Sequence, residues 1–338
     1  MTTFFPLFRL SPNDLRKVLR YMGVFELFIL STLTARARSS VASLNLKYYT
    51  LEVRIYEEPI IQANLPGGLH LIWRFTYAPG TSLLNRPASV TFTSGILSQV
   101  EKRIVFESRQ TNPCMFTWIR QIRAIFRAPY VKPLWISSRM YPPEDIRDAI
   151  GKFKSLYVTE AGTDEQNLQF MKVFGLERKL SADCRAWQAR KPFGSVLIRN
   201  FDFLDMYNPT TMTLDDMLLL NSKTILYHVN AAYFNGKDLN RFIKLWMKGD
   251  VPRMEFLQLK IDRNNIVEFY SLRRVQRNIF KGITHREVPR DQKRFFKFQG
   301  ERHEQKGGFD IEGKCGTMLT VLFQCGTTGD VTMYVWNR

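Results

Sequence analysis

Between residues 113 and 280, short apolar segments alternate with longer amphipathic ones, and this alternation strongly constrains the fold. The short segments predict strands at 133–136, 155–159, 195–199, 224–231 and 253–261. The segments between them predict helices at 143–153, 164–174, 214–221, 238–248 and 264–277. The predicted strand centres Trp135, Leu156, Leu197, Leu226 and Leu257 are 21, 41, 29 and 31 residues apart, and the long gap suggests a degenerate unit around 180–187.

Strand–helix units that recur at these spacings predict a parallel sheet in an arc that resembles a leucine-rich repeat. A doubly wound sheet is the alternative, but that fold carries a phosphate or cofactor fingerprint at a strand end, and this sequence has none. Residues 48–108 differ, because their short alternating segments are broken by proline and glycine. They predict an antiparallel sheet.

The N-terminal residues 4–46 predict three short helices. Leu15, Val18, Leu19 and Met22 lie on one face of the first helix, for which Asn13 is the predicted N-cap and Gly23 the end. The second helix, around Leu27, Leu30 and Leu33, is apolar on more than one side. Such a segment either docks on another protein or packs on the rest of its own chain, and the pattern leaves both readings open.

Composition limits the class of protein. Hydrophobic residues make up 45% of the 338 residues, including 26 Phe, so a large core can form. No run approaches the roughly 18 apolar residues of a membrane span, and the N-terminus lacks the layout of a signal peptide. The four cysteines have no CxxC spacing, which predicts free thiols in a reducing compartment, the cytoplasm and/or the nucleus.

The net charge of +18 raises nucleic-acid binding as one reading. Basic residues are concentrated only at 260–306, where 13 basic positions stand against 6 acidic ones. No recognition motif for DNA or RNA accompanies them, so we expect the basic surface to meet acidic partners or solvent.

Catalytic signatures are missing from the sequence. It contains no phosphate-binding glycine loop, no GxSxG and no HExxH, and its four histidines have no metal-ligand spacing. We interpret His228 as a packed side chain rather than a ligand. We assign Asp215 and Asp216 to the first turn of a helix that follows Thr213. Cys114 has no histidine near it in sequence, so we expect no nucleophile there, and we expect no enzyme, no cofactor and no metal.

Three segments resemble a known family. Phe5-Pro6-Leu7, followed by Leu10, Leu15, Val18-Leu19, Met22, Glu26-Leu27 and Leu30-Ser31, resembles an F-box of the nematode type. It departs from that motif in having Ser11 after Leu10, with Pro12 displaced, and Val24 in place of a second proline. Residues 224–261, with the helix 237–249, resemble the nematode F-box-associated domain of the second type. Residues 307–311, 316–317 and 333–336 resemble the end of that domain.

This resemblance implies a non-catalytic substrate receptor of an SCF-type E3 ubiquitin ligase that promotes ubiquitin-dependent degradation. The F-box would bind a Skp-family adaptor and, through it, a cullin ligase. The predicted adaptor-binding residues are Leu10, Pro12, Leu15, Val18, Leu19, Leu27 and Leu30. The C-terminal domain would bind a target protein whose identity and contact residues the sequence does not reveal. An interaction scaffold that acts without ubiquitylation is the alternative, and a basic nucleic-acid-binding protein is a further one.

The expected fold class is therefore α+β. It comprises a three-helix F-box at 1–47, a β-rich connecting region at 48–110, a strand–helix domain at 111–280 and a C-terminal β region at 281–338.

Overall fold

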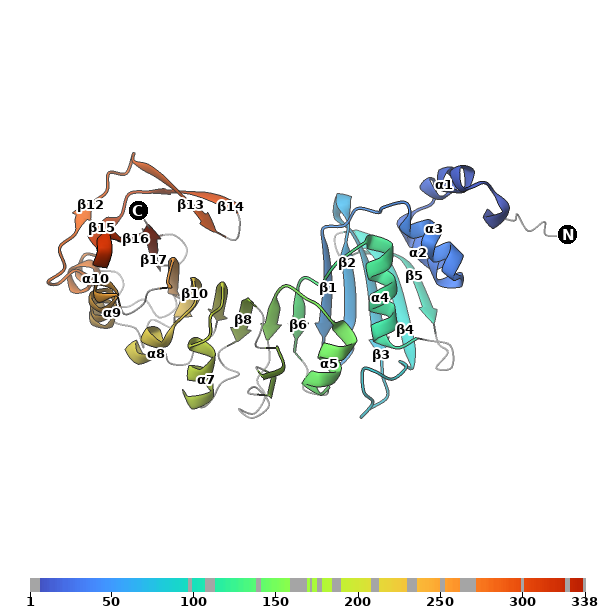
Figure 1. Ribbon diagram of the computed structural model, residues 1–338, viewed down its shortest axis with the longest axis horizontal. Coiled ribbons are helices and arrows are strands. Elements are labelled where there is room, and N and C mark those ends of the chain that lie inside the picture. Colours follow the sequence, from blue (N-terminus) through green and yellow to red (C-terminus); the bar gives the residue numbers. More distant parts are fainter. Residues whose placement is uncertain are drawn as a thin grey trace. The chain divides into compact units, whose positions relative to one another are not determined.

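The computed structural model divides into two compact units (Figure 1). Unit 1 comprises Met1–Tyr157 with Val173–Gly175, and unit 2 comprises Val158–Lys172 with Leu176–Arg338. The structure describes residues 7–96, 99–106, 113–137, 141–158, 169–170, 172–174, 178–183, 190–207, 213–229, 236–249, 253–261, 272–298, 301–325 and 329–336. Phe5 and Pro6, and most of the predicted helices 164–174 and 264–277, lie outside these residues. The many helices and strands confirm the α+β class.

Unit 1 begins with a short 3₁₀ turn, η1 (Leu7–Arg9), and three helices: α1 (Pro12–Arg20), α2 (Val24–Leu33) and α3 (Ala35–Ala42). The prediction of Asn13 as the N-cap of the first helix is wrong. Ser11 caps it, because its hydroxyl accepts a hydrogen bond from the Asp14 N–H and Pro12 takes the first helical position, where no N–H is needed.

A five-stranded antiparallel meander follows the helices, which confirms the prediction for residues 48–108. Its strands are β1 (Thr50–Ile55), β2 (Ile60–Asn64), β3 (Leu69–Thr76), β4 (Ser89–Ile96) and β5 (Gln99–Phe106). Alternate residues of β1 and β3 are buried, as expected for a sheet with one face on the core. Among the strands of unit 1, β5 lies at the edge of the sheet.

The rest of unit 1 adds a helix against the inner face of this sheet and extends the sheet beyond β1. Helix α4 (Met115–Phe126), which the sequence did not predict, buries Trp118 against Phe75 of β3. Strand β6 (Leu134–Ile136) pairs in parallel with β1, and helix α5 (Pro143–Ile150) leads to β7 (Leu156–Val158).

Unit 2 contains four parallel strands with helices between them. The strands are β8 (Lys179–Asp183), β9 (Phe203–Tyr207), β10 (Thr224–Val229) and β11 (Phe256–Ile261). The helices are α7 (Arg190–Leu197), α8 (Leu214–Leu219), α9 (Gly236–Lys248) and α10 (Leu272–Ile279). Figure 1 shows α7, α8 and α9 on one side of these strands. The predicted core face of α9 is confirmed, since its four apolar side chains are at most 5% exposed: Leu239, Phe242, Ile243 and Trp246.

The predicted strand at 195–199 is wrong. Its first residues belong to α7, where Val196 and Leu197 are buried on one side of a helix and Ile198 is 54% exposed after it. A short run of apolar residues fits a strand and a buried helix end equally well by pattern. The true strand, β9, begins at Phe203 and carries its own alternation of buried residues.

The chain returns to the same sheet at its end. Strand β17 (Gly329–Trp336) pairs antiparallel with β11, and β16 (Met318–Cys325), β15 (Phe309–Glu312) and β12 (Arg286–Glu287) extend the sheet outward. A turn, η6 (Lys314–Gly316), precedes β16. Strands β13 (Lys293–Phe298) and β14 (Glu301–Lys306) form a separate hairpin, on the side of the sheet opposite α7, α8 and α9 (Figure 1).

A buried ion pair attaches this hairpin to the sheet. Arg294 donates two hydrogen bonds to the carboxylate of Asp310, at 2.9 and 2.8 Å, and a third to the Thr320 hydroxyl. The Asp310 side chain is only 2% exposed. Burial by itself would raise the pKa of Asp310, but the hydrogen bonds from Arg294 and Thr320 outweigh it and lower that pKa.

Candidate functional site

The predicted adaptor-binding residues fall into two groups. Leu15, Leu19 and Leu27 are 6%, 1% and 2% exposed, so they form the core between the three N-terminal helices. Leu10 and Leu30 are half-buried, whereas Pro12 and Val18 are exposed. The second group presents most of the exposed apolar surface of the seven residues.

Four of the seven residues line one groove between α1 and α3. Leu10, Pro12, Leu15 and Leu19 form its apolar wall, and the groove has a volume of about 270 Å³. The rest of its lining consists of two arginines and three serines: Arg16, Arg36, Ser39, Ser40 and Ser43. This part of the lining is cationic and suits an acidic partner surface.

Two exposed apolar side chains of the helices were missed by sequence reasoning. Tyr21, at the end of α1, is 93% exposed, and Leu33, the last residue of α2, is 66% exposed. Tyr21 lies three residues after Val18 and so continues its exposed stripe. Leu33 was assigned to the apolar stripe of the second helix, but the pattern did not show which side of that helix faces solvent.

Helix α2 uses its other side to bind the sheet of unit 1. Phe28 is 1% exposed and its ring lies 4.7 Å from the rings of both Trp73 and Phe92. Phe25 stacks on Phe92 at 4.6 Å. Glu26 pairs with Lys102 of β5, whose hydrogen bond lowers the pKa of that carboxyl. The apolar side chains of α2 are therefore of three kinds: some pack among the three helices, some pack on the sheet, and some remain exposed to solvent.

In unit 2, the face of the sheet away from α7, α8 and α9 carries a row of polar side chains. The Ser181 hydroxyl donates to Asp205 at 3.0 Å, and the next strand brings His228 Nε2 to 3.7 Å from Asp205 Oδ1. Lys260 pairs in register with both His228 and Asp330. The row thus crosses five strands, β8 to β11 and β17.

Burial and charged neighbours act together on the histidine of this row. Burial lowers the pKa of His228, Asp205 acts to raise it and Lys260 to lower it further. One buried carboxylate oxygen on Asp205 and one on Asp330 find no hydrogen-bond donor among the described residues. The side chain of His228, interpreted from the sequence as packed rather than as a ligand, is half-buried at 41% exposure.

The β13–β14 hairpin covers the neighbouring part of the same face. Phe296 stacks on Phe256 at 5.7 Å, and Phe298 lies 5.1 Å from Phe256 and 6.3 Å from Phe203. Because Phe203 and Phe256 precede Asp205 and Gln258 by two residues, they share the face of the polar row. The hairpin thereby limits the polar row to the carboxyl ends of the parallel strands.

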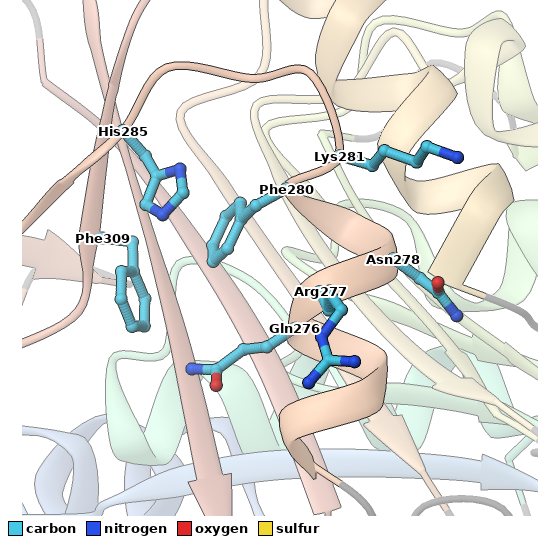
Figure 2. A pocket seen from close by; sticks show the side chains of 7 residues that line it. All are labelled: Gln276, Arg277, Asn278, Phe280, Lys281, His285 and Phe309. Carbon is cyan, nitrogen blue, oxygen red and sulfur yellow. The ribbon is translucent and has the colours of Figure 1, made fainter.

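Unit 2 also contains an open pocket where α10 ends (Figure 2). Its volume is about 690 Å³. The rings of Phe280, His285 and Phe309 converge in it, and Gln276 and Arg277 come from the last turns of α10 (Figure 2). Asn278 and Lys281 complete the described lining.

Groups associated with catalysis have structural roles. Asp215 and Asp216 lie in the first turn of α8, as predicted, and Asp216 also forms a reciprocal capping box with Thr213. Cys114 is the N-cap residue of α4, and its Sγ lies 3.4 Å from the Thr117 hydroxyl. Within the described part of the chain, no cluster of three or more His, Cys, Asp or Glu could hold a metal ion. No helix among those residues is long and apolar enough to cross a membrane.

Comparison with known families gives one match. The family model described as F-box associated matches residues 192–259, which extend from α7 to β11. This segment contains most of residues 224–261, so the predicted resemblance to an F-box-associated domain is confirmed there. Comparisons with curated proteins and with solved structures give no match.

Proposed function

We propose that this chain is the substrate-recognition subunit of an SCF-type E3 ubiquitin ligase. Helices α1–α3 would be an F-box of the nematode type that binds a Skp-family adaptor, and unit 2 would bind the target. The F-box associated match at residues 192–259 carries the proposal, because it occurs in the same chain as an N-terminal module of three short helices. The order of the two parts is that of the family.

The surface of the N-terminal helices supports an adaptor site. Leu10, Pro12 and Val18 leave apolar surface accessible, and Tyr21 and Leu33 add to it. Burying a large apolar side chain is worth about 1.5–3 kcal/mol, so each of these side chains that a partner covers would favour binding. The docking of Phe25 and Phe28 on the sheet leaves this surface free for a partner.

The architecture of unit 2 supports a role in holding a protein. We take its parallel strands, with α7, α8 and α9 on one side and the polar row on the other, as an arc that resembles a leucine-rich repeat. Such arcs offer extended surfaces to protein partners. The chain itself would perform no chemistry, and its contribution would be to bring the target close to a ubiquitin-charged enzyme on the cullin.

Co-purification with a Skp-family adaptor and a cullin tests the proposal. The variant Val18→Asp with Tyr21→Asp should lose the adaptor, because it places two charges on the exposed apolar stripe. Tyr49→Asp is the matched control, since Tyr49 is 69% exposed but lies outside the helices, and it should retain the adaptor. Adaptor binding at the wild-type level by the double variant would refute the assignment.

The same experiment distinguishes the ligase subunit from an interaction scaffold. If the wild-type chain retains the adaptor but no cullin, it acts as an interaction scaffold without ubiquitylation. Substitutions at Leu19 are less informative, because that side chain is 1% exposed and an aspartate there would unfold the helices before it affected a surface.

A further inference from the structure

The pocket beside α10 has apolar walls made of aromatic rings. Phe280 and His285 stack with their ring centroids 4.3 Å apart, and Phe309 lies 5.0 Å from Phe280 and 5.7 Å from His285. Phe323 supports them from behind, 5.8 Å from Phe280. Offset and edge-to-face ring contacts of this kind form a surface on which another aromatic side chain packs well.

The walls are fixed before any partner arrives. Asn240 of α9 donates from its amide to the carbonyls of Ile279 and Lys281, at 2.6 and 2.9 Å, and so holds both sides of Phe280. The Ile283 carbonyl lies 2.9 Å from His285 Nδ1, which orients the other ring of the stack. A preformed pocket lowers the entropy that binding must overcome.

The charged side chains that line the pocket are positive. Arg277 and Lys281 belong to the described lining and are exposed, and no acidic residue does. Two acids lie near Phe309 but outside the lining: Glu287 of β12, which pairs in register with Phe309, and Asp310, which is buried against Arg294. In Figure 2 the Arg277 side chain lies over α10 beside the rings, and Lys281 extends away from them on the other side of the helix end.

The openness of this pocket argues for a peptide rather than a small molecule. Small-molecule sites bury most of their ligand's surface, whereas His285, Arg277 and Lys281 are all exposed at the rim here. A peptide can insert one side chain and keep its remaining residues on the rim. Since the rim is cationic, those residues should be acidic.

We propose that the pocket between α10 and β15 binds an acidic segment of a partner protein, which inserts one aromatic side chain against Phe280, His285 and Phe309. The inference rests on the proposed function only where it takes this partner to be the target. The binding site itself is independent of the adaptor, because the pocket belongs to unit 2 and the helices α1–α3 to unit 1.

Fluorescence anisotropy with the full-length chain tests the pocket. The probes are fluorescein-labelled peptides of sequence GSDEDXEDEGS, in which X is Phe, Tyr or Trp. Two control peptides carry Ala at X, or Phe at X with every acidic residue replaced by Ser or Asn. We expect at least one aromatic acidic probe to bind at least tenfold more tightly than either control.

Variants of the protein locate the binding. Arg277→Glu and Phe309→Ala should each weaken the best probe at least tenfold. Lys297→Glu is the matched control, because Lys297 is an exposed cation of β13 outside the pocket lining, and it should change the affinity less than twofold. Circular dichroism of Arg277→Glu, a surface change, shows that any loss is not due to unfolding.

Three results would overturn the proposal: no aromatic probe binds better than the Ala control, the acidic residues prove dispensable, or Lys297→Glu weakens binding as much as Arg277→Glu. Failure of the proposed ligase function can be distinguished from failure of the proposed pocket. A chain that binds the probe but no Skp-family adaptor keeps the pocket and loses the ligase assignment, whereas the reverse result refutes the pocket alone.

Discussion

Replacing Phe28 by alanine tests whether the N-terminal helices are an integral part of unit 1. The side chain is 1% exposed and contacts three aromatic rings, with centroids at 4.7 Å for Trp73, 4.7 Å for Phe92 and 6.0 Å for Trp118. Truncating a buried phenylalanine costs about 3–5 kcal/mol. The two close ring pairs place the expected loss in the upper half of that range, about 4–5 kcal/mol.

Urea unfolding followed by tryptophan fluorescence measures this loss. Trp73 and Trp118 both lie beside Phe28, so their emission reports on the affected cluster. A loss of this size is a large fraction of the about 5–15 kcal/mol that stabilises a typical domain. The control is Leu33→Ala, in the same helix but 66% exposed, which should change the unfolding free energy by about 0.5 kcal/mol or less.

A small effect would refute the reasoning. If Phe28→Ala lowers the unfolding free energy by less than about 1 kcal/mol at an unchanged m-value, α2 is not packed on the sheet in solution. The helices would then be a separate module, and Phe25 and Phe28 would belong to the surface that is available to an adaptor.

Two further predictions concern unit 2. Asp310→Ala leaves Arg294 without its buried partner and should cost about 3–5 kcal/mol at pH 7. Because the pKa of Asp310 is lowered from its ordinary 3.8, this contribution is present above about pH 4 and is lost as the pH falls through the lowered value. The gap between the urea midpoints of wild type and variant should therefore stay constant from pH 7 to 5 and shrink in stronger acid; a gap that widens there would contradict the assignment. Gly308→Ala should destabilise the chain by more than Gly80→Ala in thermal unfolding: both glycines have positive φ, +108° and +72°, but only at Gly308 would the new Cβ lie 2.8 Å from Thr320 Cγ2. Equal losses for the two variants would show that the close approach does not matter.

Much of the secondary structure was readable from periodicity, and the wrong strand at 195–199 has a physical cause. Helix α9 shows its buried face through Leu239, Phe242 and Ile243, because one side of a long amphipathic helix leaves a regular pattern. The segment 195–199 is too short for that, so apolar residues at the end of α7 were taken for a strand. In the parallel strands of unit 2, Ser181, Asp205, Leu226 and Gln258 lie in register with one another. These residues are 24, 21 and 32 positions apart in the sequence.

The candidate sites were less predictable than the fold. Apolar periodicity marks a face that avoids water, but it does not say whether the chain itself or a partner covers that face. Leu15 and Leu19 were therefore grouped with Val18, although the first two are core and the third is exposed. The pocket beside α10 has no sequence signature, because Phe280 and Phe309 come together only through the packing of a helix end on a strand.

The edge position of β5 has a consequence for self-association. An edge strand offers unpaired N–H and C=O groups to a second copy of the chain. The exposed side chains of Val100 and Val105 add apolar surface to this edge. The charged run Glu101-Lys102-Arg103 lies between them, and Lys102 is tied to Glu26 of α2. Lys102 is thus shared between the edge strand and the helix that anchors the N-terminal module. Loosening α2 would break this pair and leave β5 with only its own charged side chains to oppose pairing with a second copy of the chain.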